Sequence, residues 1–441
     1  MPTIEEVPDM LRFLAFLLAF TSIPAYAAEK LVVLSPHRKS IQQELVPAFE
    51  AYYKKKFGKE IDVEWLDQGG TSDDVRFLRA KFAKNAKGIG VDLFWGGGSA
   101  VYAELSDENM FAPYELPGDL KNQIPAKAAG VPLYDATKTW YGSAMSSFGI
   151  FFNKRVLKFD GLKEPVTWED LAKPEYYGNV SLTDPRRSGT SNTMNTIILQ
   201  SLGWEKGWEL LTAISGNTRS FTHSSSDPIK AVVSGDAALA MAIDFYALAK
   251  VGDLGSKNLG FSVPPTHTVL DPDPIAILKG APNRKGAERF VEFILSAEAQ
   301  NILMLPKGSE GGPRFASLGR MAVNTLSYEQ TKGKRLMDFN PFMQKNSVLL
   351  DIEKAVKMQR VFNDLVGALL IDTHSELKNA WGRLVKAKKA QDPSAVAAIS
   401  AMPITEKEFL ALSDRWDNEV FRNKTINAWV AFAKNKYESV K

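Results

Sequence analysis

The sequence predicts an α/β protein with two lobes, two hinge strands between them and a helical C-terminal extension. From Leu31 onward, short apolar segments of strand character alternate with stretches of helical periodicity, an order that favours mostly parallel sheets. One long apolar strand leaves the first lobe and a later strand leads back to it. From about Phe339 the apolar residues recur at helical spacing. A chain that crosses twice between lobes suits closure around a ligand.

The first lobe is expected in residues 28–147. Its predicted elements are strands Leu31–Leu34, Ile61–Leu66 and Val91–Trp95 and helices Ser40–Phe57 and Asp73 to about Ala83. Each strand runs into a small, polar turn, and ligands of open α/β sheets bind beyond the carboxyl ends of the strands. Glycines in such turns let backbone amides approach a ligand. The candidate ligand-binding residues of this lobe are Ser35, His37, Thr71, Gly97, Gly98 and Ser99.

The hinge strands are expected at Ser143–Asn153, leaving the first lobe, and at Asp273–Lys279, leading back. The second lobe should occupy residues 148–265, and its predicted strands are Val180–Thr183, Arg219–Thr222 and Leu239–Asp244. Residues 266–338 return to the first lobe. Residues 339–441 form the helical region, in which Thr405 and Glu408 predict a capping box. This region could cap a lobe, mediate dimerisation or extend the core.

One helix start in the second lobe has the composition of an anion-binding site. The first backbone N–H groups of a helix have no partner inside it, and the summed peptide dipole adds roughly half a positive charge there. Ser188, Gly189 and Thr190 could therefore hold a phosphate or a carboxylate, and Arg186 could add a charge-assisted contact. The simpler alternative is that Ser188 or Thr190 only caps the helix and that Arg186 is solvated.

Composition and the N-terminal segment narrow the class of protein. The formal charge of +3 is spread along 441 residues without a basic tract, so no nucleic-acid partner is expected. The chain has no cysteine, which excludes disulfides and thiolate metal sites. The apolar run Phe13–Phe20, with Arg12 before it, predicts a signal peptide at residues 1–27 that is cleaved after Ala27; an uncleaved anchor is the alternative. Acidic residues before Met10 suggest that Met10 is the true start.

These features together resemble a known family. They include Asp-Pro-x-x-Ser-Gly-Thr at residues 184–190, at a helix start, and Gly-Asp-Ala-Ala-Leu-Ala-Met at residues 235–241. The chain resembles the periplasmic substrate-binding proteins of ABC importers, in the branch that holds ferric-ion, phosphonate, sugar-phosphate and thiamine binders. The resemblance covers roughly residues 29–320. It implies a type II periplasmic-binding-protein fold that closes on one ligand and hands it to an ABC permease of the inner membrane.

The resemblance also implies alternatives for the ligand. Ferric binders of this branch use a histidine after the first strand, an acid after the third strand and a tandem tyrosine pair in the second lobe. His37 and Tyr246 match two of these positions, but glycines at residues 96–98 replace the acid. Asp244 could substitute only if the strand continues regularly to Tyr246. The helix start at residues 188–190 matches the place where the branch holds an anion or a phosphate. A small anionic solute, phosphorylated or a phosphonate, is therefore the expected ligand, and ferric iron or thiamine is the alternative.

No enzymatic activity is expected. The sequence has no Gly-x-Ser-x-Gly elbow, no phosphate-binding Gly-Lys-Thr loop and no His-Glu-x-x-His pattern. Paired carboxylates can act from distant parts of a chain, so a secreted hydrolase is the alternative from another class. No cofactor is expected. The expected partners are the small-molecule ligand and the permease, and the protein is expected to be a periplasmic monomer.

Overall fold

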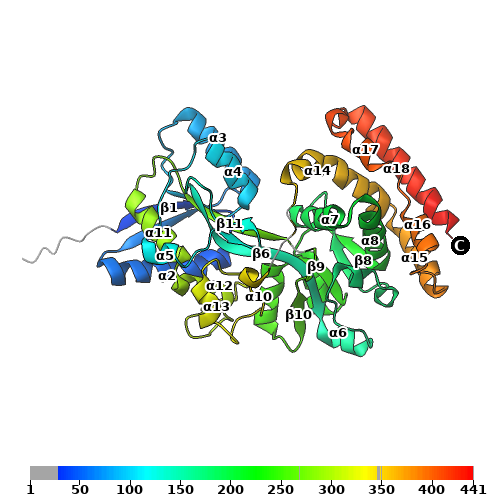
Figure 1. Cartoon of the computed structure of the whole chain (residues 1–441), viewed down its shortest axis with the longest axis horizontal. Helices are drawn as coiled ribbons and strands as arrows, with labels where there is room; N and C mark the ends of the chain where they lie inside the picture. The colour runs from blue at the N-terminus through cyan, green and yellow to red at the C-terminus, as the bar shows by residue number, and fades with distance from the viewer. Residues whose placement is uncertain (1–27, 268, 345–347, 349, 441) are drawn as a thin grey trace, which may run out of the picture.

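The computed structural model describes residues 28–440 except residues 268, 345–347 and 349, and it has two α/β lobes side by side (Figure 1). The predicted fold class is confirmed. The predicted signal peptide and Met10 lie outside the described residues. Within the described parts of the chain, no helix combines the length and apolar character needed to cross a membrane.

Lobe 1 is built on parallel strands whose carboxyl ends share one rim. Its elements are β1 (Glu29–Leu34), α2 (Lys39–Phe57), β2 (Ile61–Leu66), α3 (Thr71–Lys84), β3 (Leu93–Trp95), α4 (Ser99–Asp107), α5 (Gly118–Lys121), β4 (Lys127–Ala128) and β5 (Val131–Pro132), joined later in the chain by α11 (Arg284–Leu295), α12 (Ala297–Met304) and α13 (Thr325–Gln330). Because β1 pairs in parallel with both β2 and β3, the turns after these strands lie close together. Phe49 and Phe290 pack edge to face in the core beneath them, with ring centroids 4.8 Å apart.

Two buried strands join the lobes. The first half of β6 (Trp140–Asn153) pairs antiparallel with β11 (Leu270–Ile277) in lobe 1, and its second half pairs with strands of lobe 2. The change of partner falls between Ser147, opposite Leu270, and Phe148, opposite Ile243. The sheet is therefore continuous across the hinge, in the order β2-β1-β3-β11-β6 followed by the lobe 2 strands β9 (Leu239–Ile243), β7 (Val180–Thr183) and β8 (Thr218–Thr222).

Lobe 2 repeats the α/β pattern with parallel β7, β8 and β9. Its elements are α6 (Lys154–Phe159), η1 (Trp168–Ala172), η2 (Pro174–Tyr176), β7 (Val180–Thr183), α7 (Gly189–Leu202), α8 (Trp204–Asn217), β8 (Thr218–Thr222), α9 (Asp227–Ser234), β9 (Leu239–Ile243), α10 (Asp244–Leu254) and β10 (Leu259–Ser262). The prediction that Asp244 ends a strand is wrong, because α10 begins at this residue. The strand alternation considered for Asp244 and Tyr246 therefore does not apply.

The helical C-terminal region shares one core with lobe 2, and it is drawn in orange and red beside α8 in Figure 1. Its elements are η3 (Pro341–Met343), α14 (Ile352–Val366), the π-helical turn η4 (Gly367–Ile371), α15 (His374–Lys386), α16 (Pro393–Ser400), α17 (Glu406–Leu410), η5 (Ser413–Arg415) and α18 (Glu419–Ser439). The fully buried Trp381 donates its indole N–H to Oδ1 of Asn217 at 2.7 Å. The capping box of Thr405 and Glu408 is confirmed. Of the three roles left open by the sequence, extension of a core is the one that these contacts show.

Candidate functional site

A hollow of about 400 Å³ lies between the lobes, next to the hinge residues Phe148 on β6 and Leu270 on β11. Its lining comes from both lobes, the hinge and the helical C-terminal region: Gly97, Gly98, Ser99, Ala100, Val131, Phe148, Gly189, Asn192, Thr193, Thr196, Val269, Leu270, Asp271, Val348, Leu350, Ala355 and Gln359. Four of the sequence-predicted site residues are therefore brought together here, namely Gly97, Gly98, Ser99 and Gly189. We call this hollow the cleft.

The start of α7 borders the cleft from lobe 2. Ser188 is the N-cap, and its hydroxyl accepts a hydrogen bond from the amide of Ser191 at 3.2 Å. The amides of Gly189 and Thr190 have no acceptor among the described residues. A Cβ atom added at Gly189 would meet no atom within 4 Å, so the space next to this residue is open. The capping role and the free amides are thus found at the same helix start.

The turn between β3 and α4 borders the cleft from lobe 1. Gly96, Gly97 and Gly98 all have positive φ, between 88° and 113°, a backbone conformation that favours glycine. A Cβ atom on Gly97 would lie 2.7 Å from a methyl carbon of Thr71, which packs directly against this turn. Helix α4 then begins at Ser99. The turn therefore places its backbone and the start of α4 at the cleft, and the glycines add no side chains that would block a ligand.

Asp271 on β11 is the acidic group of the cleft. The hydroxyl of Ser99 donates to its carboxylate at 2.7 Å, at the start of α4. Burial raises the pKa of Asp271 to about 6, although the hydrogen bond from Ser99 acts in the opposite direction. The lining that the structure describes contains no lysine, arginine or histidine. Neutralisation of a bound anion in this cleft falls to backbone amides and helix dipoles.

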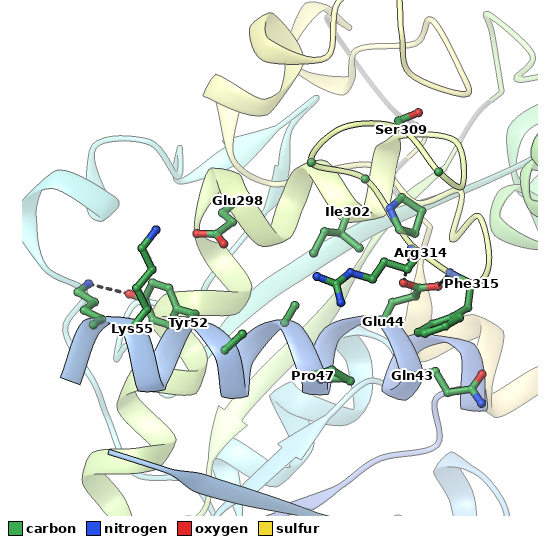
Figure 2. Close-up of a pocket in the computed structure, with 17 residues that line it drawn as sticks. Gln43, Glu44, Pro47, Tyr52, Lys55, Glu298, Ile302, Ser309, Arg314 and Phe315 are labelled. Carbon is green, nitrogen blue, oxygen red and sulfur yellow. Dashed lines mark hydrogen bonds between the residues drawn. The ribbon is translucent and has the colours of Figure 1, made fainter. Parts of the chain in front are cut away.

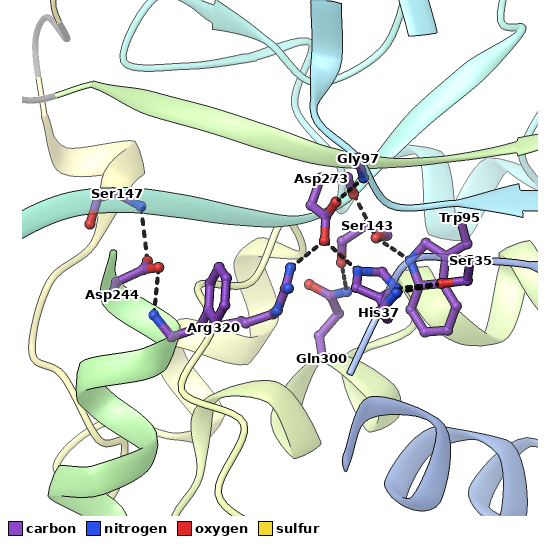
Figure 3. A network of polar contacts seen from close by, with 11 residues as sticks. Ser35, His37, Trp95, Gly97, Ser143, Ser147, Asp244, Asp273, Gln300 and Arg320 are labelled. Atoms are coloured by element: carbon purple, nitrogen blue, oxygen red, sulfur yellow. Dashed lines mark hydrogen bonds and ion pairs between the residues drawn. The ribbon is translucent and has the colours of Figure 1, made fainter. Parts of the chain in front are cut away.

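Ser35 and His37 belong to a buried polar network behind the cleft (Figure 3). The His37 ring has Nδ1 at 3.0 Å from the Ser35 hydroxyl and Nε2 at 2.6 Å from Oδ2 of Asp273. Asp273 also pairs with Arg320 and accepts the amide of Gly97 at 3.1 Å. Burial alone would raise the pKa of Asp273, but His37 and Arg320 hold it well below its usual range. Both ring nitrogens of His37 are thus engaged, and Asp273, the partner of Nε2, also holds the turn that carries Gly97.

The remaining predicted residues lie outside the cleft lining. The buried carboxylate of Asp244 accepts the amide of Ser147 at 2.9 Å, and burial raises its pKa to about 7 (Figure 3). The ring of Tyr246 lies under the guanidinium of Arg38, with Cζ 4.9 Å from the ring centroid, a contact between the lobes. Within the described part of the chain, no group of three or more histidine, aspartate or glutamate side chains could hold a metal ion.

Arg186 connects lobe 2 to the helical C-terminal region instead of facing the cleft. Its guanidinium forms ion pairs with Asp184 at 2.8 Å and with Asp372 at 2.9 Å. Each of these carboxylates accepts more than one N–H from Arg186, the geometry in which arginine binds carboxylates most strongly. In this structure the charge of Arg186 is already neutralised by the two acids.

A larger hollow of about 860 Å³ lies on lobe 1 alone, between α2, α12 and the loop at residues 308–315 (Figure 2). The loop is held by Glu44, whose carboxylate accepts the amides of Arg314 and Phe315. None of the predicted site residues lines this hollow. Because one lobe supplies all of its walls, closure of the hinge cannot enclose a ligand there.

Several cleft residues were missed from the sequence. On α7, Asn192, Thr193 and Thr196 lie at helical spacing from the predicted Gly189, and this polar stripe could have been recognised. Asp271 gave no local signal, because its position depends on the pairing of β11 with β6. The contribution of α14 depends on how the C-terminal region packs against lobe 2.

Comparisons with known proteins agree with this architecture. Residues 91–309 match the family described as bacterial extracellular solute-binding protein. The chain is 27% identical over 350 residues to the phosphoglycerate transport regulatory protein PgtC of Salmonella typhimurium, covering 77% of this chain and 80% of that protein.

Two solved structures share the fold. The periplasmic binding protein AfuA of Actinobacillus pleuropneumoniae, solved with fructose-6-phosphate, has a TM-score of 0.54 at 19% identity, covering 82% of this chain and 99% of that one. The apo ferric ion-binding protein A of Pasteurella haemolytica has a TM-score of 0.53 at 17% identity, covering 77% and 97%. The chain is therefore similar to the bacterial extracellular solute-binding proteins over residues 91–309, and it has the two-lobed fold of the periplasmic binding proteins.

Proposed function

We propose that the protein captures a small anionic solute, phosphorylated or a phosphonate, in the cleft and delivers it to an ABC permease from the periplasm. The observation that carries this proposal is the meeting of two helix starts, α4 from lobe 1 and α7 from lobe 2, at one hollow. Each start presents the positive end of a helix dipole, and α7 adds two amides without an acceptor among the described residues. This arrangement suits an anionic solute that contacts both lobes, with its charged group at the start of α7.

The size of the cleft supports an organic solute. About 400 Å³ is within the range of roughly 300–1,000 Å³ that is usual for small-molecule sites. A single ferric ion would leave most of this space unfilled. His37, which the ferric alternative requires, has both ring nitrogens within hydrogen-bonding distance of Ser35 and Asp273. We therefore rank a phosphorylated solute above iron.

Asp271 adds a condition on the solute. At neutral pH its carboxylate places negative charge at the start of α4, which repels a second anion there. The anionic group of the solute is therefore assigned to Gly189 and Thr190 on α7. A hydroxyl or ammonium group elsewhere on the solute can donate a hydrogen bond to Asp271.

The names of the relatives support the same class of ligand. The name of the relative PgtC refers to phosphoglycerate transport, and the structural neighbour AfuA was solved with fructose-6-phosphate. The ferric alternative has support from the ferric ion-binding protein. None of these descriptions refers to catalysis, and we propose binding without turnover.

A thermal-shift screen of residues 28–441 tests the proposal. The panel contains phosphate esters, phosphonates, thiamine, polyamines and ferric citrate. A true ligand at a hundredfold excess over its dissociation constant stabilises the folded state by about 2.7 kcal/mol. Stabilisation by ferric citrate alone, with a visible charge-transfer colour that Tyr246→Phe abolishes, would replace this proposal with the ferric one. Release of product from a bound ester would replace it with the hydrolase.

A further inference from the structure

Helix α14 forms part of the cleft wall although it belongs to the helical C-terminal region. Ala355 and Gln359 are one turn apart on this helix and line the same hollow as Gly98 and Gly189. Both residues lie beyond residue 309, where the match to the solute-binding family ends. The cleft therefore has a wall outside the segment that matches the family model.

The inner face of α14 is fixed in the core of lobe 2. Met358, Phe362 and Leu365 on this face are buried, and the Phe362 ring packs edge to face on Trp208 with centroids 6.0 Å apart. These positions are adjacent on the helix to Ala355 and Gln359. The wall thus moves with lobe 2 whenever the hinge opens or closes.

Two polar contacts hold α14 against α7, the helix that carries the free amides. The side-chain amide of Asn192 donates to Oδ1 of Asn363 at 2.7 Å. Near the start of α14, the Gln200 side chain accepts the amide of Asp351 at 2.8 Å and donates to its carbonyl at 3.2 Å. The anion-binding helix start and the α14 wall therefore keep a fixed distance from each other.

The chemistry of the enclosed space is mixed. Ala355 shares the cleft with Val131, Phe148, Val269 and Leu270, so a solute that fills the space next to α14 meets apolar carbon on several sides. Hydroxyl groups placed against such a surface lose hydrogen bonds to water, which weakens the binding of a polyhydroxylated solute. Gln359 supplies a side-chain amide that has no partner among the described residues.

We propose that α14 sets the specificity of the cleft by selecting an organic anion with an apolar portion beside its anionic group, such as an alkyl or aryl phosphate or phosphonate. Ala355 leaves room for the apolar portion, and Gln359 bonds a polar atom at its far end. This inference rests on the proposed function, because it takes the anion site at Gly189 as given. Polyhydroxylated sugar phosphates and inorganic phosphate bind more weakly in this scheme.

The test compares three probes, phenyl phosphate, glycerol 3-phosphate and inorganic phosphate, on three proteins by calorimetry. In the wild-type protein, phenyl phosphate should bind at least tenfold more tightly than the other two. Ala355→Trp fills the space beside α14 and should weaken the binding of phenyl phosphate at least tenfold. The matched control is Lys357→Trp, two residues further along the helix. The Lys357 side chain is 60% exposed and pairs with Asp414. This control should bind like the wild type, and both variants should keep the wild-type melting temperature within a few degrees.

The outcomes separate this inference from the function on which it rests. If glycerol 3-phosphate or inorganic phosphate binds as tightly as phenyl phosphate, the selection for an apolar portion is wrong while anion capture stands. If a folded Ala355→Trp variant binds phenyl phosphate normally, α14 does not border the bound solute. If no probe binds to the wild-type protein, both proposals fall.

Discussion

Replacing Gly189 with leucine tests the anion site with little risk to folding. Gly189 is the first residue of α7, its φ is not in the positive region, and an added Cβ atom meets nothing within 4 Å. A larger side chain therefore causes no backbone strain, and it starts from a Cβ atom in open space. Removing a glycine from such a position also restricts the unfolded chain, which stabilises a protein by about 0.4–1 kcal/mol. The melting temperature without ligand should stay the same or rise slightly.

The effect on binding follows from the amides that the new side chain obstructs. An anion displaced from one of the amides of Gly189 or Thr190 loses a hydrogen bond to a charged group, worth about 1.5–3 kcal/mol. This loss corresponds to a rise in Kd of roughly 10- to 150-fold. Isothermal titration with the best ligand of the thermal-shift screen measures it directly.

Gly118→Leu is the matched control for this experiment. Gly118 is also the first residue of a helix, α5, and an added Cβ atom there meets nothing within 4 Å, but the residue does not line the cleft. This variant should bind with wild-type affinity. A folded Gly189→Leu variant with unchanged Kd would refute the assignment of the anion to α7.

Three further perturbations follow from the structure. Asp271→Asn should tighten the binding of a phosphonate several-fold at pH 7.5. The difference in Kd between variant and wild type should disappear as the pH falls below 6, because the wild-type carboxyl then takes up a proton. A difference in Kd that stays constant in calorimetry across this pH range would contradict the prediction. Burial lowers the pKa of Lys436 from the usual lysine value of 10.5 to about 7. Between about pH 7 and pH 10.5 the unfolded chain therefore binds more protons than the folded chain, and the free energy of unfolding rises with pH across that window. Lys436→Met should therefore raise the free energy of unfolding at pH 7 by more than about 1 kcal/mol and flatten this rise, as measured by denaturant titration. Trp381→Ala should lower the free energy of unfolding by about 3–5 kcal/mol, because the ring lies in the core shared by lobe 2 and the C-terminal region. The variant should still unfold in one cooperative transition, and two separate transitions in calorimetry would argue against a shared core.

The sequence predicts the fold well because its signals are local. Strand and helix periodicity, the turn glycines at residues 96–98 and the capping box at Thr405 are each read within a few residues of chain, and the structure agrees with them. The strand that was expected to end at Asp244 shows the limit of such signals. Apolar residues lie on both sides of Asp244, and this acidic residue in the first turn of α10 is the local mark of the change of period.

The candidate site was less predictable because it depends on long-range pairing. His37 stands at a strand end, where a ligand contact is a reasonable expectation, yet Asp273, which is 236 positions away in sequence, lies beside its ring. The charge of Arg186 is likewise taken by Asp372 from the C-terminal region. In both cases the partner is brought in by packing of the whole chain, which no local pattern encodes.

The placement of the two helix starts has a consequence for how binding and closure are coupled. The free amides of Gly189 and Thr190 belong to lobe 2, whereas Ser99 and Asp271 belong to the lobe 1 side of the hinge. A solute with an anionic group at one end and a donor group at the other gains both sets of contacts only when the lobes are close. Such a solute binds the closed state more tightly than the open one and shifts the population toward it. A bare anion reaches only the α7 amides, so it should bind weakly and leave the hinge equilibrium almost unchanged, a difference that small-angle scattering with each ligand can measure.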